Sequence, residues 1–436
     1  KGIEATPQIM INLEKKYGKT FGFYMGSSLE IVTTNLEHIR ELFISNFSCF
    51  VARKYVPIWR VYPAVGGLLQ VDQKGTHGAG WKEIRSVISA IFTTGKMKKM
   101  HKLFHDQLDC LLNELTKKAK EHDGSVDIYG EYQALTLDMI ARCALGIYGI
   151  SCVRDRTTPF YTRARRFFAL VGIGSIVQRV SFFLPFVGRF RRFSGFGRPE
   201  RQIVNDLSVV VKQRVAERAA GKERPLPDMI DLILDENDKR AQNGGHPLHH
   251  DVIVSNCWHI MLAGYETTST ALAYATWLLA KHPECQARLH EEVAETFGED
   301  DIDYDRVMKM PYMNAVFMEA LRLKSPVVTF TARRCVQETS FSEGNVRIPK
   351  GVNVVVPVQC VHLSEENYPD ALSFIPERFL DRKNPSSSPT FLAFGIGPRN
   401  CVGARFAEME FKTTLASVLR VFRFEIDPSE ASSQNI

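Results

Sequence analysis

The densest group of chemically suggestive residues is the segment Phe394–Gly403, which reads FGIGPRNCVG. Two glycines and a proline predict a tight loop before Cys401, and a helix is expected to begin right after it. A thiol at a helix N-terminus meets free N–H groups and the positive end of the helix dipole, which both favour the thiolate. Arg399 adds a positive charge, and Gly403 lets a flat group approach closely. Such a thiolate suits the electron-donating axial ligand of a haem iron.

A second candidate lies inside a long apolar segment. Residues 251–281 are expected to form one helix of about 45 Å, apolar on most faces, that crosses the interior. The polar residues Glu266 and Thr267 interrupt it near its middle, after Ala263. The Thr267 hydroxyl could simply bond the carbonyl of Ala263, as helical threonines often do. Alternatively, Thr267 and Glu266 could move protons.

The chain resembles the cytochrome P450 family over nearly its whole length, and the residues of its motifs are most like those of the microsomal family 3 branch. The Cys401 loop resembles the haem-binding signature of that family in every fixed position, at Phe394, Gly397, Arg399, Cys401 and Gly403. Four further motifs occur in the family's order: Trp-x-x-x-Arg at 81–85, Ala-Gly-Tyr-Glu-Thr-Thr at 263–268, Glu-x-x-Arg at 319–322 and Phe-Ile-Pro-Glu-Arg-Phe at 374–379.

This resemblance implies the fold, the cofactor and the site. The fold class would be mainly α with minor β, with a long central helix and a Cys-ligand loop, as a single haem domain over 1–436. The cofactor would be haem b, with Cys401 as the axial ligand of its iron and Thr267 and Glu266 as catalytic residues. Further haem-binding residues would be Arg399, Arg85, Trp81, Arg333, Arg53, Phe394 and Ala263. Glu319, Arg322 and Arg378 would form a buried structural cluster.

The implied activity is that of a haem-thiolate monooxygenase, which inserts one oxygen atom from O2 into a hydrophobic small molecule. The chain has no pyrophosphate-binding Gly-x-Gly-x-x-Gly, so we expect electrons from a separate NADPH–cytochrome P450 reductase, with cytochrome b5 as a second donor. Two alternatives stay open. One is a haem-thiolate isomerase or dehydratase acting on peroxides, against which the Glu266–Thr267 pair argues. The other is a truncated, non-catalytic haem-binding protein.

Composition narrows the partners. The 436 residues include 55 Lys and Arg against 49 Asp and Glu, a net charge of +6, and no basic tract with interleaved aromatics predicts nucleic-acid binding. Nine cysteines without a Cys-x-x-Cys pair argue against disulfides or a zinc ribbon. A basic run at Lys96, Lys98, Lys99, His101 and Lys102 is either a solvated face or a docking site for an acidic redox partner.

Membrane contact is suggested by the segment 156–199, which has nine Arg, no Asp, Glu or Lys, and short apolar runs. It is either a set of buried helix ends with solvated Arg or a basic, apolar flap on an anionic membrane. No run is long enough to span a bilayer. The resemblance implies the cytosolic face of the endoplasmic reticulum, and we expect the family's N-terminal anchor and final β-hairpin to be missing from this chain.

The remaining expectations concern local structure. Strands are predicted at 20–25 and 29–33, helices at 81–120, 125–146 and 402–421, and β-type segments at 327–335, 346–349 and 352–358. The substrate cavity should be lined by parts of 54–72, 160–187, 256–267 and 326–331. A metal site at His246, His249 and His250 is not expected, because no Cys or carboxylate cluster completes it.

Overall fold

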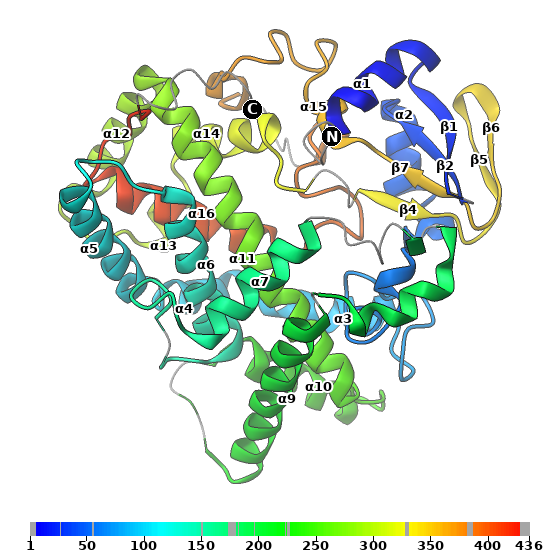
Figure 1. The fold of residues 1–436 in the computed structure, drawn as a ribbon, viewed down its shortest axis with the longest axis horizontal. Coiled ribbons are helices and arrows are strands. Elements are labelled where there is room, and N and C mark those ends of the chain that lie inside the picture. The colour runs from blue at the N-terminus through cyan, green and yellow to red at the C-terminus, as the bar shows by residue number, and fades with distance from the viewer. Residues whose placement is uncertain are drawn as a thin grey trace.

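Helices dominate the computed structural model, which describes residues 6–26, 28–54, 56–149, 151–172, 180, 181, 183–195, 197–222, 224, 227–327, 331–381 and 387–427 (Figure 1). The expected class, mainly α with minor β, is confirmed. None of the helices in these ranges combines the length and the apolar character needed to cross a membrane. Besides those introduced below, the helices are α1 (Thr6–Tyr17), α2 (Leu36–Arg40), α7 (Pro159–Gly172), α10 (Met229–Gln242), α12 (Pro283–Phe297), α13 (Tyr304–Val307) and α15 (Val358–His362).

The main sheet lies at one side of the molecule beside α1 and α2 (Figure 1). Its strand order is β1-β2-β7-β4-β3, formed by β1 (Thr20–Met25), β2 (Ser28–Thr33), β7 (Asn353–Val355), β4 (Ala332–Arg334) and β3 (Ala52–Arg53). The predicted hairpin of β1 and β2 is confirmed, and a second hairpin joins β5 (Thr339–Phe341) to β6 (Val346–Ile348). In the antiparallel pairing of β3 with β4, Arg53 lies directly opposite Arg333. Two cations far apart in sequence are thereby neighbours.

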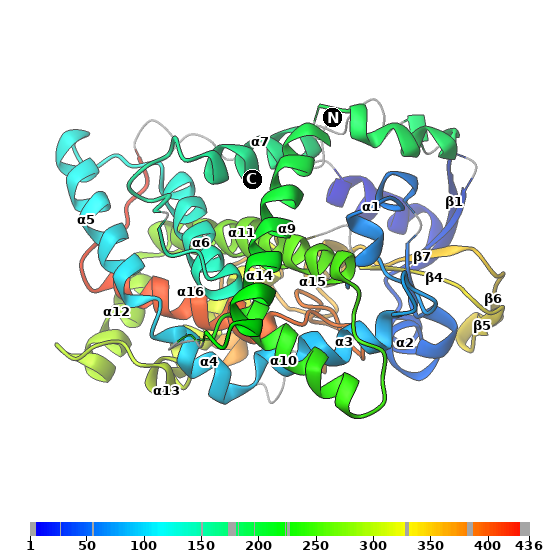
Figure 2. The ribbon, with the colours of Figure 1, turned by 90° about the horizontal axis from the view of Figure 1, so that it is seen from below.

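The long central helix is α11 (His250–Lys281), whose 32 residues match the predicted helix to within one residue. It runs through the middle of the molecule in both views (Figures 1 and 2). It packs against α6 (Ile128–Leu145), α9 (Gly197–Ala219), α14 (Pro311–Leu323) and α16 (Ala404–Leu419). Most of its side chains are buried, as expected of a helix that is apolar on most faces.

The helical pattern predicted over 81–120 is present, but it is interrupted twice. The chain forms α3 (Trp81–Ser89), α4 (Thr94–His101) and α5 (His105–Glu121). The first break arises because Thr93 has an extended backbone, with ψ of 152°. The second break is a turn in which the Phe104 N–H bonds the His101 carbonyl, three residues back rather than four. The predicted β-type segments also shorten to β4, β6 and β7, although residues 328–330 lie outside the described part of the chain.

Candidate active site

The Cys401 loop is held in place by its own backbone. The Cys401 N–H donates to the Phe394 carbonyl at 2.8 Å, which closes the loop. Gly395 and Gly397 have φ of 67° and 76°, the left-handed region that favours glycine. A Cβ on Gly397 would also lie 1.9 Å from the backbone oxygen of Phe43, so no other residue fits there. Helix α16 follows two residues later than predicted, with Gly403 as its N-cap.

The Cys401 side chain is accessible, yet burial raises the pKa of its thiol. The Gly403 N–H and the cations of Arg85 and Arg53 lower this pKa, but only in part. The expectation that Arg399 supplies the cation beside the thiol is wrong. Its guanidinium turns away and donates to the backbone carbonyls of Val51, Leu68 and Val71.

A cluster of guanidinium groups surrounds this loop. Burial lowers the pKa of Arg53 to about 10, and the nearby Cys401 and Arg85 modify it in opposite directions. The pKa values of Arg333 and Arg399 fall well below the usual range, first through burial and then through repulsion from Arg53. Like charges repel strongly in a buried setting, so an anionic group bound among them would stabilise the cluster.

The same cluster contains buried donors without acceptors in the described part of the chain, namely Nε1 of Trp81 and Nε of Arg333 and Arg399. Haem carries two propionates, and its iron carries positive charge that stabilises a thiolate. Buried cations and unpaired N–H groups beside an accessible thiol are therefore the surroundings that haem requires. The residues present fit the group.

Helix α3 fastens the loop from the other side. The two terminal nitrogens of Arg85 donate to the carbonyl and side-chain oxygen of Asn400, at 2.7 and 2.8 Å. Trp81, one turn earlier, is buried, and the Arg399 guanidinium lies 5.6 Å from its ring centroid. Sequence reasoning missed Asn400, although its position directly before Cys401 was a usable signal. Arg85 thus positions the residue that precedes the thiol.

On α11, the polar patch divides between two directions. Ala263 is exposed between the part-buried Leu262 and Gly264, and the Thr267 hydroxyl donates to its carbonyl at 2.5 Å. Glu266 instead turns toward α6, where it accepts hydrogen bonds from the Tyr129 hydroxyl and, at 3.1 Å, from the Gln133 amide. Sequence reasoning missed Tyr129 and Gln133. No pattern links them to Glu266, because the pairing depends on how α6 crosses α11.

The predicted structural cluster of Glu319, Arg322 and Arg378 is formed at α14, which carries the first two residues. The guanidinium of Arg322 binds the carboxylate of Glu319 through two hydrogen bonds, and both side chains are fully buried. Arg378, from the segment after α15, adds a third contact at 3.3 Å. The structure therefore brings together all three residues of the predicted cluster.

A sequence model of the family described as Cytochrome P450 matches residues 4–435. The chain belongs to the cytochrome P450 family. It is 30% identical to cytochrome P450 3A29 of Sus scrofa, over 94% of this chain and 80% of that protein. It is 31% identical to the cytochrome P450 cyp-13B1 of Caenorhabditis elegans, over 93% of this chain and 81% of that protein. It is therefore a monooxygenase, and its cofactor is haem b bound through a cysteine thiolate.

The basic run of this P450 differs in part from its prediction. Lys98, Lys99 and Lys102 are exposed on or beside α4, and Lys98 pairs with Asp305 at 2.6 Å. His101 does not belong to the surface. It is buried, and burial together with the neighbouring His105 lowers its pKa to about 4, which leaves it neutral at pH 7.

The segment 156–199 of this P450 contains both a buried arginine and exposed apolar side chains. Arg191 is buried between Trp59 and Trp258, at 4.3 and 5.9 Å from their ring centroids, and pairs with Glu200. The turns of 3-10 helix η7 (Pro185–Phe193) that carry it also expose large apolar side chains. The exposed residues here are Phe183, Leu184, Phe186, Phe190 and Phe193. Residues 173–179 and 182, which include part of the predicted cavity lining, lie outside the described residues.

Proposed function

We propose that this P450 inserts one oxygen atom from O2 into a hydrophobic small molecule, with electrons from a separate NADPH–cytochrome P450 reductase. The observation that carries the proposal is the accessible Cys401 thiol, whose pKa Arg85 and Arg53 lower, together with the buried guanidinium groups of Arg333 and Arg399 next to Arg53. When bound, haem-thiolate supplies the reductive activation of O2. The whole chain, 1–436, would act as one haem domain.

The side chains around the loop would bind and orient the cofactor. Cys401 would be the iron ligand, and the loop glycines together with the Arg85–Asn400 contact would fix its position. Phe394 and Ala263 would flank the haem from the loop and from α11. The propionates would be held by Trp81, Arg85, Arg53, Arg333 and Arg399.

Glu266 and Thr267 would manage protons on the distal side. The Thr267 hydroxyl donates a hydrogen bond to the Ala263 carbonyl. Its oxygen lone pairs remain available to accept a hydrogen bond from another group. Glu266 is tied to α6 through Tyr129 and Gln133, so these two residues would hold the carboxylate in place. This acid–threonine pair favours the monooxygenase over a peroxide isomerase or dehydratase.

Partners would meet opposite faces of the molecule. Figure 2 shows α3 and α4 at one edge and α7 at the opposite edge, with the green segment that follows α7 beside it. The lysines on and beside α4 would form the docking surface for the reductase or cytochrome b5. The exposed phenylalanines of 183–193 would contact the membrane surface on the cytosolic side of the endoplasmic reticulum.

The test combines a spectrum with a turnover assay. The reduced, CO-bound wild-type protein should show the red-shifted Soret band of thiolate-ligated haem, which Cys401→Ser should lose and the control Cys49→Ser should keep. NADPH with the reductase should then support oxygen insertion into a lipophilic substrate. Turnover of peroxides without the reductase would indicate the isomerase class instead. A correct spectrum without any turnover would indicate a non-catalytic haem protein.

A further inference from the structure

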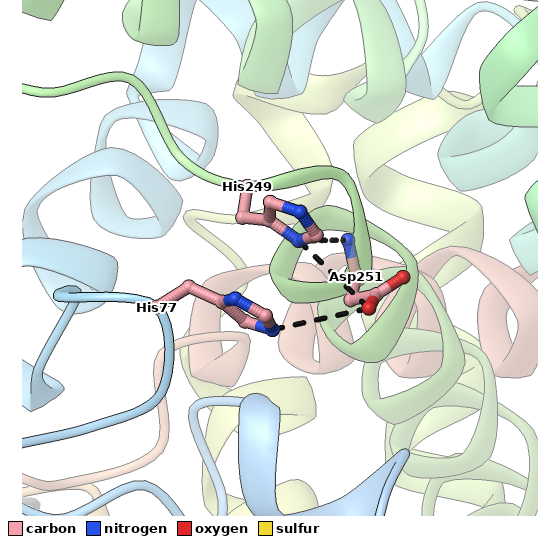
Figure 3. A group of neighbouring side chains, drawn as sticks. All are labelled: His77, His249 and Asp251. Carbon is pink, nitrogen blue, oxygen red and sulfur yellow. Dashed lines mark hydrogen bonds and ion pairs between the residues drawn. The ribbon is translucent and has the colours of Figure 1, made fainter.

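A second group of ligand-type side chains lies outside the Cys401 site, where the turn before α3 meets the start of α11 (Figure 3). His77 comes from the turn 72–80, His249 is the N-cap of α11, and Asp251 stands in its first turn. No carboxylate is expected from the sequence beside these histidines, but the structure places Asp251 there. Its partners are His77 and His249, rather than His246 or His250.

The three side chains lie close together. Nε2 of His77 and Nδ1 of His249 each lie 3.8 Å from Oδ2 of Asp251, and all three ligand atoms lie within 4.8 Å of one another. The two imidazole rings stack with centroids 3.9 Å apart and an angle of 11° between their planes. The side chains are close to half exposed, so an ion from solvent can reach them.

These contacts leave the Asp251 carboxylate short of positive charge. A separation of 3.8 Å is too long for a hydrogen bond. No Lys or Arg in the described ranges pairs with this carboxylate. One divalent cation between the three groups would supply this charge, and it would replace the hydrogen bond that Nδ1 of His249 accepts from the Asp251 N–H at 3.2 Å.

We propose that His77, His249 and Asp251 bind one divalent transition-metal ion of the zinc class, with water completing its shell. Zinc binds His nitrogen and carboxylate oxygen at about 2.0–2.2 Å, which places tetrahedral ligand atoms about 3.4 Å apart. The ligand atoms, which lie within 4.8 Å of one another, therefore need to close by about 1.4 Å or less, and the stacked rings have to turn so that both nitrogens face one ion. Two imidazoles and one carboxylate suit zinc, copper or nickel, whereas calcium and magnesium prefer all-oxygen shells.

The ion would tether the turn 72–80 to α11. That turn is followed directly by α3. The Trp81 N–H at the start of α3 donates to the Asp72 carbonyl at 2.8 Å, which closes the turn against the helix. Helix α3 in turn carries Arg85, which fastens the Cys401 loop through Asn400. The surface ion and the cofactor site would therefore share one connected segment.

Binding is tested by calorimetry with Zn²⁺ alone on metal-stripped, haem-loaded protein, because loading occupies the reactive thiol. Wild type should bind one equivalent of Zn²⁺, unaffected by excess Mg²⁺. His77→Ala, His249→Asn and Asp251→Asn should each weaken binding at least tenfold. Asn at 249 keeps a side-chain acceptor for the helix N-terminus. The exposed His246→Ala is the matched control and should bind as wild type, and the CO-bound spectrum shows that each variant is folded.

The tether is tested separately with trypsin at the exposed Lys74, in the same turn. Zn²⁺ should slow this cleavage in wild type and leave it unchanged in His77→Ala. An unchanged rate in wild type would overturn the tether. Absence of one-to-one binding would overturn the site, as would binding that His77→Ala or Asp251→Asn leaves intact. An equal loss in His246→Ala would show adsorption to surface histidines.

Discussion

The carboxylate of Glu319 and the guanidinium of Arg322 are joined by two hydrogen bonds, of 2.6 and 2.8 Å, between side chains without accessible surface. The Ile375 N–H donates to the same carboxylate at 3.0 Å. Arg322 also donates to the carbonyls of His362 and Ala371 at 2.8 and 2.7 Å. The pair thus fixes the chain that follows α15 against α14.

Loss of one partner should therefore destabilise the fold. Glu319→Ala leaves a buried guanidinium without its counter-charge, a change that typically costs about 3–5 kcal/mol. The free energy of unfolding of a protein is usually about 5–15 kcal/mol, so little folded holoprotein should accumulate. Haem-loaded yield, read from the CO-bound spectrum, is the measurement. Glu37→Ala, in an exposed Glu-x-x-Arg of α2, is the control, and equal yields from both variants would refute a structural role.

Thr267→Ala should separate haem binding from oxygen chemistry. Within the described part of the chain, the Thr267 hydroxyl bonds only inside α11, so its removal should leave the fold and the CO-bound spectrum intact. Without the hydroxyl, protons should reach the distal side less directly, and NADPH consumption should produce more hydrogen peroxide and less product. Thr116→Ala removes the same kind of hydrogen bond, to the Leu112 carbonyl, from α5 and should stay coupled. Unchanged coupling in Thr267→Ala would exclude the proton-delivery role.

Features set by local sequence were predictable. Gly397 and Cys401 lie in one short loop, and Glu319 and Arg322 are one helical turn apart, so spacing alone brings them together. His101 shows the limit. Its lysine-rich surroundings predict a surface position, but the turn between α4 and α5 buries it, 3.2 Å from the hydroxyl of Thr413. That contact spans more than 300 positions, and no local pattern reports it.

Other site contacts also depend on packing between distant segments. Arg85 meets Asn400, and Glu266 meets Tyr129, because separate helices cross at particular points. A motif can place Arg85 near a cofactor, but it cannot say which backbone atom the side chain will bind. The His77 ligand is similar, since only the packing of its turn against α11 brings it to Asp251.

Glu410 is a fully buried carboxyl group on α16. Burial raises its pKa well above the usual value, and the Thr268 hydroxyl on α11 lowers it only in part. The folded protein therefore keeps this proton at pH values where the unfolded chain has lost it. Stability contributed by this group is present below the unfolded pKa of about 4.5 and is lost as the pH rises toward the folded pKa.

Glu410→Gln should remove this pH dependence, because the amide cannot ionise. The linkage for one such group is about 1.4 kcal/mol per pH unit. Between pH 5.5 and 7.5 the melting temperature of wild type should therefore fall relative to that of Glu410→Gln. The exposed Glu295→Gln should follow wild type. Parallel melting curves for wild type and Glu410→Gln would show that Glu410 is ionised in the folded protein.

The exposed phenylalanines around η7 make membrane binding testable. Phe183 and Phe186 are 68% and 58% exposed, and the segment 156–199 carries nine Arg without an acidic residue. A basic side chain near an anionic bilayer contributes about 1 kcal/mol, which salt screens. Burial of a phenylalanine contributes about 1.5–3 kcal/mol, which salt does not screen. Wild type should therefore bind anionic liposomes, and part of this binding should persist at high salt.

Replacement of Phe183 and Phe186 by Ser should remove the part of the liposome binding that persists at high salt. Two insertions of this size correspond to at least a tenfold loss of binding at high salt. The neighbouring Phe182 lies outside the described residues, so the variant is limited to Phe183 and Phe186. Leu372→Ser removes an equally exposed apolar side chain elsewhere, at 77% exposure, and should float with the liposomes as wild type does. A flotation assay that leaves the wild-type protein entirely unbound at moderate salt would instead establish a solvated surface.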